Sequence, residues 1–305
     1  MKSLIFIACA SLLTGCSEKP ATDVENTFAP FVFSPEQASN AWSQVTAFVD
    51  ECTPRNSGTP GSENAAAWLH KRLIGQGIDT TIDRFTDSTP RGPKPFFNVL
   101  ASIPGKSDKW ILLLSHFDTM SGISGSFQGA NDSGSSTGLL LELATALHAS
   151  APCKYNVLCA FLDGEECMLA YSDRDGFHGS RRLANTMKQQ GRKIKAVILM
   201  DMIGDRDLKI TIPRNSTAAL RVLALQAAEA TGNRDKIGLF DGMIYDDHQA
   251  FLDLGYPAIN LIDFQYGSHP GKNDYWHTTK DSIDKLSVDS LLVTGRIVME
   301  MLNGL

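Results

Sequence analysis

The hydrophobic positions along this chain follow two alternating patterns. Short apolar runs typical of buried strands occupy residues 97–103, 110–115, 156–162, 196–200, 208–212 and 257–262. Apolar side chains at helical spacing predict helices at residues 34–49, 62–74, 133–149, 177–190, 217–230, 246–254 and 288–302. Strands that alternate with helices predict an α/β fold, a three-layer α/β/α sandwich around a central, mostly parallel mixed sheet.

Two of the predicted helices carry recognisable start signals. Ser34 precedes Pro35, and a serine cap followed by proline at the first helical position is a common helix start. Ser62 is expected to cap the second helix. The stretch 42–305 contains no linker long enough to divide it, so residues 34–305 are expected to form a single domain.

The beginning of the chain has a different pattern from the rest. Lys2 precedes the apolar run 4–13, which leads into Leu13-Thr14-Gly15-Cys16. This order predicts a secretory signal at residues 1–16, and its last four residues resemble a bacterial lipobox in which Cys16 is lipidated. The alternative is an ordinary signal peptide with a chance cysteine. The polar residues 17–33 predict a tether.

These features predict a lipoprotein of the bacterial cell envelope. No aspartate follows Cys16 to retain it at the inner membrane, so we expect the periplasmic side of the outer membrane. The chain has a net charge of -6 and no basic cluster, which argues against nucleic acid as a partner. No apolar run in its body is long enough to span a membrane, so membrane contact is expected only through the lipid anchor. The oligomeric state stays open.

Four cysteines remain beyond the predicted signal. In an oxidising compartment they allow up to two disulfides in one of three connectivities, and buried free thiols are an equal alternative. No C-x-x-C pair is present, so a zinc site built from cysteines is not expected. The four are Cys52, Cys153, Cys159 and Cys167.

The strongest chemical signal is a pair of glutamates after a buried strand. The run 156–162 leads into Asp163-Gly164-Glu165-Glu166. Two adjacent carboxylates at the edge of a core repel each other unless a positive charge holds them. A metal ion resolves this conflict if one glutamate binds it and the other stays free as a base.

Further residues of types that bind metals follow predicted strands, precede the helix at 133–149, or lie in a loop near the C-terminus. In open α/β sheets ligands bind at the carboxyl ends of the strands, so these side chains should meet. Each has an ordinary explanation alone, since Asp132 could simply cap a helix. Together they form a nitrogen and oxygen donor set that suits zinc. The residues are His116, Asp118, Asp132, Asp201 and His277.

These segments resemble the superfamily of zinc aminopeptidases and glutaminyl cyclases, peptidase family M28, over about residues 42–305. The matching segments include His116-x-Asp118, Asp163-Gly164-Glu165-Glu166 and Met200-Asp201-Met202. Asp246-Asp247-His248 and Trp276-His277-Thr278 are more similar to animal-type glutaminyl-peptide cyclotransferases than to aminopeptidases. The resemblance implies a zinc exopeptidase-like fold.

The resemblance also implies a role for each site residue. Glu165 would be the general acid and base, joined to Asp201 and Asp246 in a carboxylate hydrogen-bond network. His116, Asp118 and His248 are the candidates for binding a second metal or supporting the site. Apart from the resemblance, the place of His248 after two aspartates suggests that it orients a carboxylate. The implied ligands of a single catalytic zinc ion are Asp132, Glu166 and His277.

The resemblance places two residues in the substrate pocket. Trp276 would line it, and Tyr171 stands where the animal enzymes have a second pocket tryptophan. Asn260 stands where they have a histidine. The segment 265–274 is longer than its animal counterpart, so the pocket rim is expected to differ.

The expected activity is a zinc-dependent acyl transfer that converts the N-terminal glutamine of peptides and proteins to pyroglutamate and releases ammonia. The first alternative is a zinc-dependent aminopeptidase. In that case two zinc ions are expected, with His116 and Asp201 holding the second and Asp132 bridging both. The second alternative is a non-catalytic peptide-binding lipoprotein, against which the intact Glu165 argues, because binding alone needs no free base.

Overall fold

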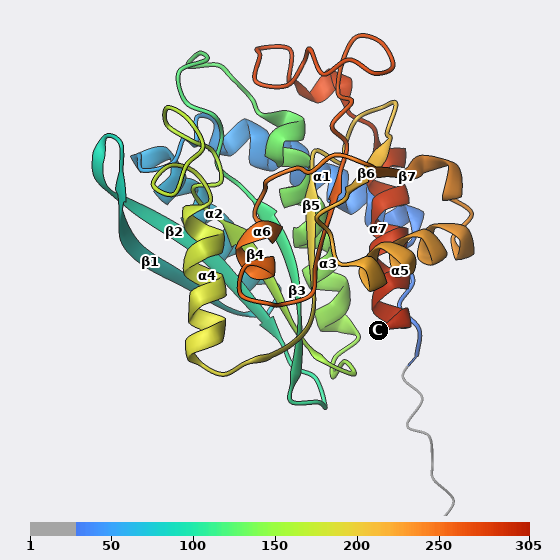
Figure 1. Ribbon diagram of the computed structural model, residues 1–305. Coiled ribbons are helices and arrows are strands. Elements are labelled where there is room, and N and C mark those ends of the chain that lie inside the picture. The colour runs from blue at the N-terminus through green and yellow to red at the C-terminus, as the bar shows by residue number, and fades with distance from the viewer. Residues whose placement is uncertain (1–28) are drawn as a thin grey trace, which may run out of the picture.

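The computed structural model describes residues 29–305, which form one mixed sheet between two layers of helices (Figure 1). The strands are β1 (Asp79–Thr89), β2 (Gly92–Ile103), β3 (Lys109–His116), β4 (Asn156–Leu162), β5 (Lys193–Asp201), β6 (Ile210–Pro213), β7 (Ile237–Phe240) and β8 (Ala258–Ile262). Their order across the sheet is β1-β2-β4-β3-β5-β8-β6-β7.

The centre of the sheet is parallel and its edges are mixed. Strands β4, β3, β5 and β8 run parallel to one another. On one side β1 pairs antiparallel with β2, and β2 with β4; on the other side β6 is antiparallel to β8 and parallel to β7. The central strands are apolar along most of their length because helices cover both of their faces. The predicted fold class is therefore confirmed.

The helices divide between the two faces of the sheet. They are α1 (Pro35–Cys52), α2 (Pro60–Gly75), α3 (Ser136–Ala149), α4 (His178–Gln189), α5 (Ala218–Ala230), α6 (His248–Leu252) and α7 (Val288–Gly304). Helices α4 and α6 cover one face, while α1, α3 and α7 lie on the other (Figure 1). In β3, Ile111 and Leu113 join the larger core and Leu112 and Leu114 the smaller, as the twofold period of a strand requires.

Some elements differ from the prediction. Strands β1 and β7 were not expected from the sequence. Helix α2 begins at Pro60, and its cap is Thr59, whose side chain accepts from the backbone N–H of Gly61, rather than Ser62. The predicted helix 133–149 is preceded by a π-helical turn, η1 (Ala130–Ser135), which carries Asp132.

The folded domain begins before the predicted boundary at Ser34. The backbone N–H of Phe31 donates to Asn303 Oδ1 at 2.7 Å, and Phe33 is buried against Gly295 of α7. The end of the predicted 17–33 tether therefore packs on the domain. Cys16 and the 1–16 signal lie outside the described residues. Within residues 29–305, no helix has both the length and the apolar character needed to cross a membrane.

All four cysteines of the described chain are buried free thiols, which is the second of the two alternatives left open by the sequence. Cys159 lies inside β4 with its side chain in the larger core. Burial raises the pKa of Cys52 to about 12 and those of Cys153 and Cys167 to about 11. These thiols therefore act as small apolar core groups rather than as nucleophiles.

Candidate metal and catalytic site

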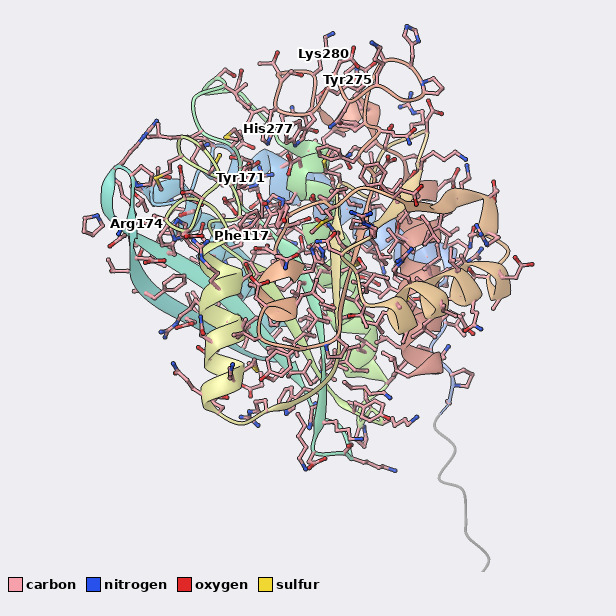
Figure 2. All side chains as sticks on the ribbon, viewed as in Figure 1. Phe117, Tyr171, Arg174, Tyr275, His277 and Lys280 are labelled. Carbon is pink, nitrogen blue, oxygen red and sulfur yellow. The ribbon has the colours of Figure 1, made fainter. Side chains whose placement is uncertain are left out.

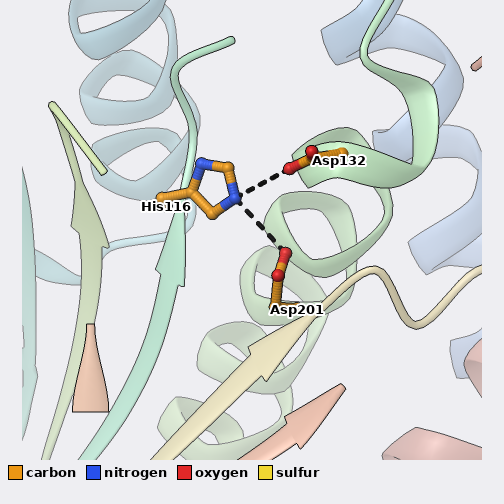
Figure 3. Close-up of side chains that lie close together, drawn as sticks. All are labelled: His116, Asp132 and Asp201. Atoms are coloured by element: carbon orange, nitrogen blue, oxygen red, sulfur yellow. Dashed lines mark hydrogen bonds and ion pairs between the residues drawn. The ribbon is translucent and has the colours of Figure 1, made fainter. Parts of the chain in front are cut away.

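Three predicted ligands meet at the carboxyl edge of the sheet. His116 ends β3, Asp201 ends β5, and Asp132 lies in η1 between them (Figure 3). His116 Nε2 lies 3.0 Å from Asp132 Oδ1 and 3.3 Å from Asp201 Oδ1. All three side chains are buried, so the group is closed to bulk water on most sides.

A second donor group shares Asp132 with the first. His277 Nε2 lies 3.3 Å from Asp132 Oδ2 and 3.1 Å from Glu166 Oε1. In each group the three donor atoms lie within 4.8 Å of one another. Asp132 therefore turns one oxygen to each group, and both ligand sets expected from the sequence are assembled side by side.

His116 and His277 offset the negative charge of the carboxylates in the two donor groups. Burial lowers the pKa of His116, but hydrogen bonds to its aspartate neighbours outweigh that effect and raise this pKa well above its usual value. For His277 the same balance of burial against hydrogen bonds to Asp132 and Glu166 raises the pKa to about 10. Each imidazole thus carries the positive charge that a bound cation would supply, and the donor types fit zinc.

Asp118 lies outside both donor groups and holds the turn that carries the two glutamates. Its Oδ1 accepts the backbone N–H of Glu165 at 3.2 Å, and its Oδ2 accepts that of Glu166 at 3.1 Å. The Ser57 hydroxyl donates to the same Oδ2 at 2.7 Å. His116 Nδ1 lies 3.6 Å from Asp118 Oδ1, which is within ion-pair distance but too far for a hydrogen bond.

Glu165 is buried beside the donor groups but belongs to neither. Burial raises the pKa of Glu165 well above its usual value, and the nearby carboxylates of Glu166 and Asp246 raise it further. Its only side-chain hydrogen bond within residues 29–305 comes from the Tyr171 hydroxyl at 3.2 Å, which also lies 3.1 Å from Glu166 Oε2. This is the arrangement of a base placed near a metal without binding it.

Asp201 and Asp246, the two aspartates expected in a network with Glu165, have other hydrogen-bond partners in the structure. Asp201 lies against His116, and Asp246 Oδ2 accepts from Asn260 Nδ2 at 2.7 Å. Burial raises the pKa of Asp246 well above its usual value, and the Asp201 carboxylate adds to this effect. Within residues 29–305, no hydrogen bond joins Glu165 to Asp201 or Asp246, so the expected network does not include a direct bond to this glutamate.

A cavity of about 260 Å³ opens onto these carboxylates. Trp276 forms part of its wall, stacked on His277 at 3.9 Å between ring centroids and edge-on to Phe264 at 5.1 Å. Tyr171 also lines the cavity and is stacked on Phe177. Figure 2 shows Tyr171 and His277 in the loops beyond the sheet edge. The other lining residues are Asp132, Glu165, Asp201, Met243, Ile244, Tyr245, Asp246 and Ile262.

The structure gives His248 a partner different from the expected carboxylate. Its Nε2 lies 3.1 Å from Asn215 Nδ2, and burial lowers its pKa to about 3. Asn215 also donates to the carbonyl oxygen of Ile244 at 2.8 Å. His248 therefore supports the segment that forms one cavity wall, and its expected place beside a carboxylate is corrected.

Arg55 is a supporting residue that the sequence did not reveal. It is fully buried, and its guanidinium donates to the carbonyl oxygens of Phe117 at 2.7 Å, Gln128 at 2.8 Å and Gly129 at 2.7 Å. These carbonyls lie beside His116 and just before η1. Arg55 thus links the segment that follows His116 to the segment that precedes Asp132.

Asp281 is the second residue that the sequence analysis missed. Its carboxylate accepts the backbone N–H of Asn131 at 2.7 Å, that of Asp132 at 3.1 Å, and the Tyr266 hydroxyl at 2.9 Å. It therefore fixes the backbone that presents Asp132. Arg55 is far from the ligands in the sequence, whereas Asp281 follows His277 by four residues. Both bind backbone groups of distant segments, so no local motif pointed to them.

The family model for peptidase family M28 matches residues 98–302, and the chain belongs to this family. Within it the chain is 26% identical to a glutaminyl-peptide cyclotransferase of Drosophila melanogaster over 276 residues, covering 80% of this chain and 76% of the relative. The predicted resemblance to glutaminyl cyclases within the M28 superfamily is confirmed.

Solved structures agree with this grouping. The glutaminyl cyclase of an Acidobacteriales bacterium is 35% identical, with a TM-score of 0.82, and the match covers 94% of this chain and 98% of that one. The glutaminyl cyclase of Porphyromonas gingivalis is 27% identical, with a TM-score of 0.79, over 89% and 98% of the two chains. The similarity therefore extends over nearly the whole fold.

Proposed function

We propose that this protein is a zinc-dependent glutaminyl-peptide cyclotransferase that converts N-terminal glutamine to pyroglutamate and releases ammonia. The observation that carries the proposal is Glu165, a buried carboxylate outside both donor groups, at the wall of a small aromatic cavity. A volume of about 260 Å³ suits one side chain, because sites for larger ligands occupy roughly 300–1,000 Å³. The similarity to known glutaminyl cyclases supports the same activity.

One zinc ion is the expected cofactor. Asp132, Glu166 and His277 would hold it, because this set of two carboxylates and one imidazole forms a compact zinc-compatible group. When bound, zinc supplies a Lewis acid that polarises the side-chain amide carbonyl of glutamine.

The chain's own residues account for the proton and for the substrate geometry. The α-amine of glutamine attacks its own side-chain carbonyl carbon, forming a C–N bond, and the bond to the departing ammonia breaks. Glu165 takes the proton of the amine and returns it to the leaving nitrogen, so no protein nucleophile is needed. The walls at Trp276 and Phe264 limit the side chain to folded conformers in which the amine lies near the carbonyl.

The second candidate function is a zinc aminopeptidase. A specific observation favours it, because His116, Asp132 and Asp201 form a second donor group next to the first. Two zinc ions bridged by Asp132 would then bind, and Glu165 would activate a water molecule. The aromatic cavity and the cyclase relatives favour the first candidate.

The deciding experiment uses purified, zinc-loaded protein and two peptides, one beginning with glutamine and the other with leucine. Ammonia released from the first while the second stays intact supports the cyclase. Free leucine from the second peptide would favour the aminopeptidase instead. Two tightly held zinc ions per chain, measured by atomic emission, would contradict the single-metal proposal.

Substitution of Glu165 tests its role directly. Glu165→Gln should reduce turnover at least 100-fold, as expected for loss of a general base, while zinc content stays at the level of the unchanged protein. Glu142→Gln is the matched control, because Glu142 is a buried glutamate on α3 far from the donor groups. Loss of zinc from the Glu165 variant would mean that Glu165 is a ligand.

We also propose that the protein is a lipoprotein on the periplasmic side of the bacterial outer membrane. The proposal rests on the apolar run 4–13 and the lipobox-like segment that ends at Cys16. Expression in a bacterium with labelled fatty acid should label the chain, and Cys16→Ser should remove the label. A labelled Cys16→Ser variant, or an unlabelled original, would refute the anchor.

A further inference from the structure

A second cavity adjoins the catalytic one. It has a volume of about 420 Å³ and shares Tyr171, Tyr245 and Asp246 with the first cavity. Its remaining lining residues are Ser172, Asp173, Phe177, Arg181, Gln249, Ala250 and Asp253. Nothing in the proposed chemistry uses this space.

The exposed side of the catalytic cavity leads in part toward this space. Its exposed lining includes Tyr171 and Tyr245, 42% and 63% exposed and shared with the second cavity, as well as Met243 and Phe264, 45% and 37% exposed, whereas Ile262 at the inner wall is buried. With the glutamine side chain between Trp276 and Glu165, the rest of the peptide must pass this exposed side. On the path past the two tyrosines, which are the most exposed aromatic groups of the rim together with Phe264, the second residue of the substrate arrives where the two cavities meet.

The lining of the second cavity favours a cationic side chain. Asp173 and Asp253 contribute carboxylates, and the stacked rings of Tyr171 and Phe177 contribute aromatic surface. Both features attract a positive charge. Gln249 Nε2 donates to Asp253 Oδ1 at 2.6 Å and holds that carboxylate in place.

The lining also contains one cationic side chain, Arg181, whose guanidinium is hydrogen-bonded to the backbone. Arg181 donates to the carbonyl oxygen of Gly176 at 2.6 Å and to that of Ser172 at 3.4 Å. It therefore braces the loop that carries Tyr171. An acidic side chain in the cavity would still face Asp173 and Asp253.

We propose that this cavity binds the second residue of the substrate peptide and prefers lysine or arginine there. The inference rests on the proposed cyclase function, because it assumes that glutamine occupies the first cavity. The preference acts on binding, so it should change KM more than kcat.

The test compares three peptides that begin Gln-Arg, Gln-Ala and Gln-Glu and are otherwise identical. We expect kcat/KM to be about tenfold higher for Gln-Arg than for Gln-Glu, since two exposed carboxylates and an aromatic face each contribute a modest factor. In the double variant Asp173→Asn/Asp253→Asn this ratio should fall to about twofold or less, while the Gln-Ala value stays within about twofold. The control Asp50→Asn/Asp79→Asn removes two exposed charges elsewhere and should keep the ratio.

Equal kcat/KM for the three peptides, or a ratio that survives the double substitution, would overturn the inference. Failure of the cyclase proposal is a separate outcome, in which no glutamine peptide is converted. Calorimetric binding of the same uncyclised peptides then still decides the subsite, because the order Gln-Arg before Gln-Glu is expected there as well.

Discussion

Replacement of Arg55 by lysine tests how the metal donors are held. Arg55 binds three backbone carbonyls with three nitrogens and is fully buried, with its guanidinium over the ring of Phe48 at 4.9 Å. Lysine keeps the positive charge, but its three N–H donors share one nitrogen, which cannot take the places of three separate guanidinium nitrogens. We therefore expect about one of the three carbonyl bonds to remain well formed.

The expected loss in the free energy of unfolding follows from the two lost hydrogen bonds. A hydrogen bond to a charged group contributes about 1.5–3 kcal/mol, so the free energy of unfolding should fall by about 3–6 kcal/mol. That is a large part of the roughly 5–15 kcal/mol that stabilises a typical domain. Because the freed carbonyls flank His116 and Asp132, zinc affinity should also fall about 10–100-fold.

Urea unfolding measures the free energy of unfolding, and competition with a zinc-binding dye measures the zinc affinity. Arg182→Lys is the matched control, since Arg182 also makes two hydrogen bonds, to Asp83, but its side chain is 47% exposed. We expect that variant to lose less than about 1 kcal/mol. A loss below about 1 kcal/mol in Arg55→Lys, equal to the control, would refute the reasoning that Arg55 holds the site.

Two further predictions concern buried groups. His248 has its pKa lowered to about 3 by burial, so its stabilisation is complete above pH 6.5 and is lost as pH falls; at pH 5.5 the loss is about 1.4 kcal/mol. Urea midpoints of His248→Gln should depend less on pH between 5.5 and 7, and an unchanged dependence would exclude this role. Cys52, Cys153 and Cys167 should react with a thiol reagent at pH 8 only after unfolding, and rapid labelling of the folded chain would contradict their burial.

Long buried elements could be predicted from the sequence because their patterns are local. Strand β4 matches the predicted 156–162, since helices on both faces require it to be apolar throughout. Strand β1 has charged residues at Asp79, Asp83, Arg84 and Asp87, and it is an edge strand that pairs only with β2. Its extended form depends on that partner, so its own residues give little signal.

In the site, too, residues that follow a local pattern could be predicted, whereas residues that act on distant segments could not. Four donor residues were found because each follows a predicted strand or precedes a helix, and parallel strands bring their carboxyl ends to one edge. His277 lies in a loop, and its role as a ligand came from the resemblance. Arg55 and Asp281 act through backbone groups that lie 62–74 and 149–150 positions away in the chain. Hydrogen bonds to the backbone do not depend on the side chain of the partner, so they leave no motif in a single sequence.

Because Asp132 turns one oxygen toward His116 and the other toward His277, the two donor groups are thermodynamically linked. An ion that draws the carboxylate toward one group changes the affinity of the other, and the reverse change must have the same size. Metal occupancy of one donor group therefore depends on the occupancy of the other. The number of metal ions that this scaffold holds can change through the orientation of a single side chain, with no ligand gained or lost.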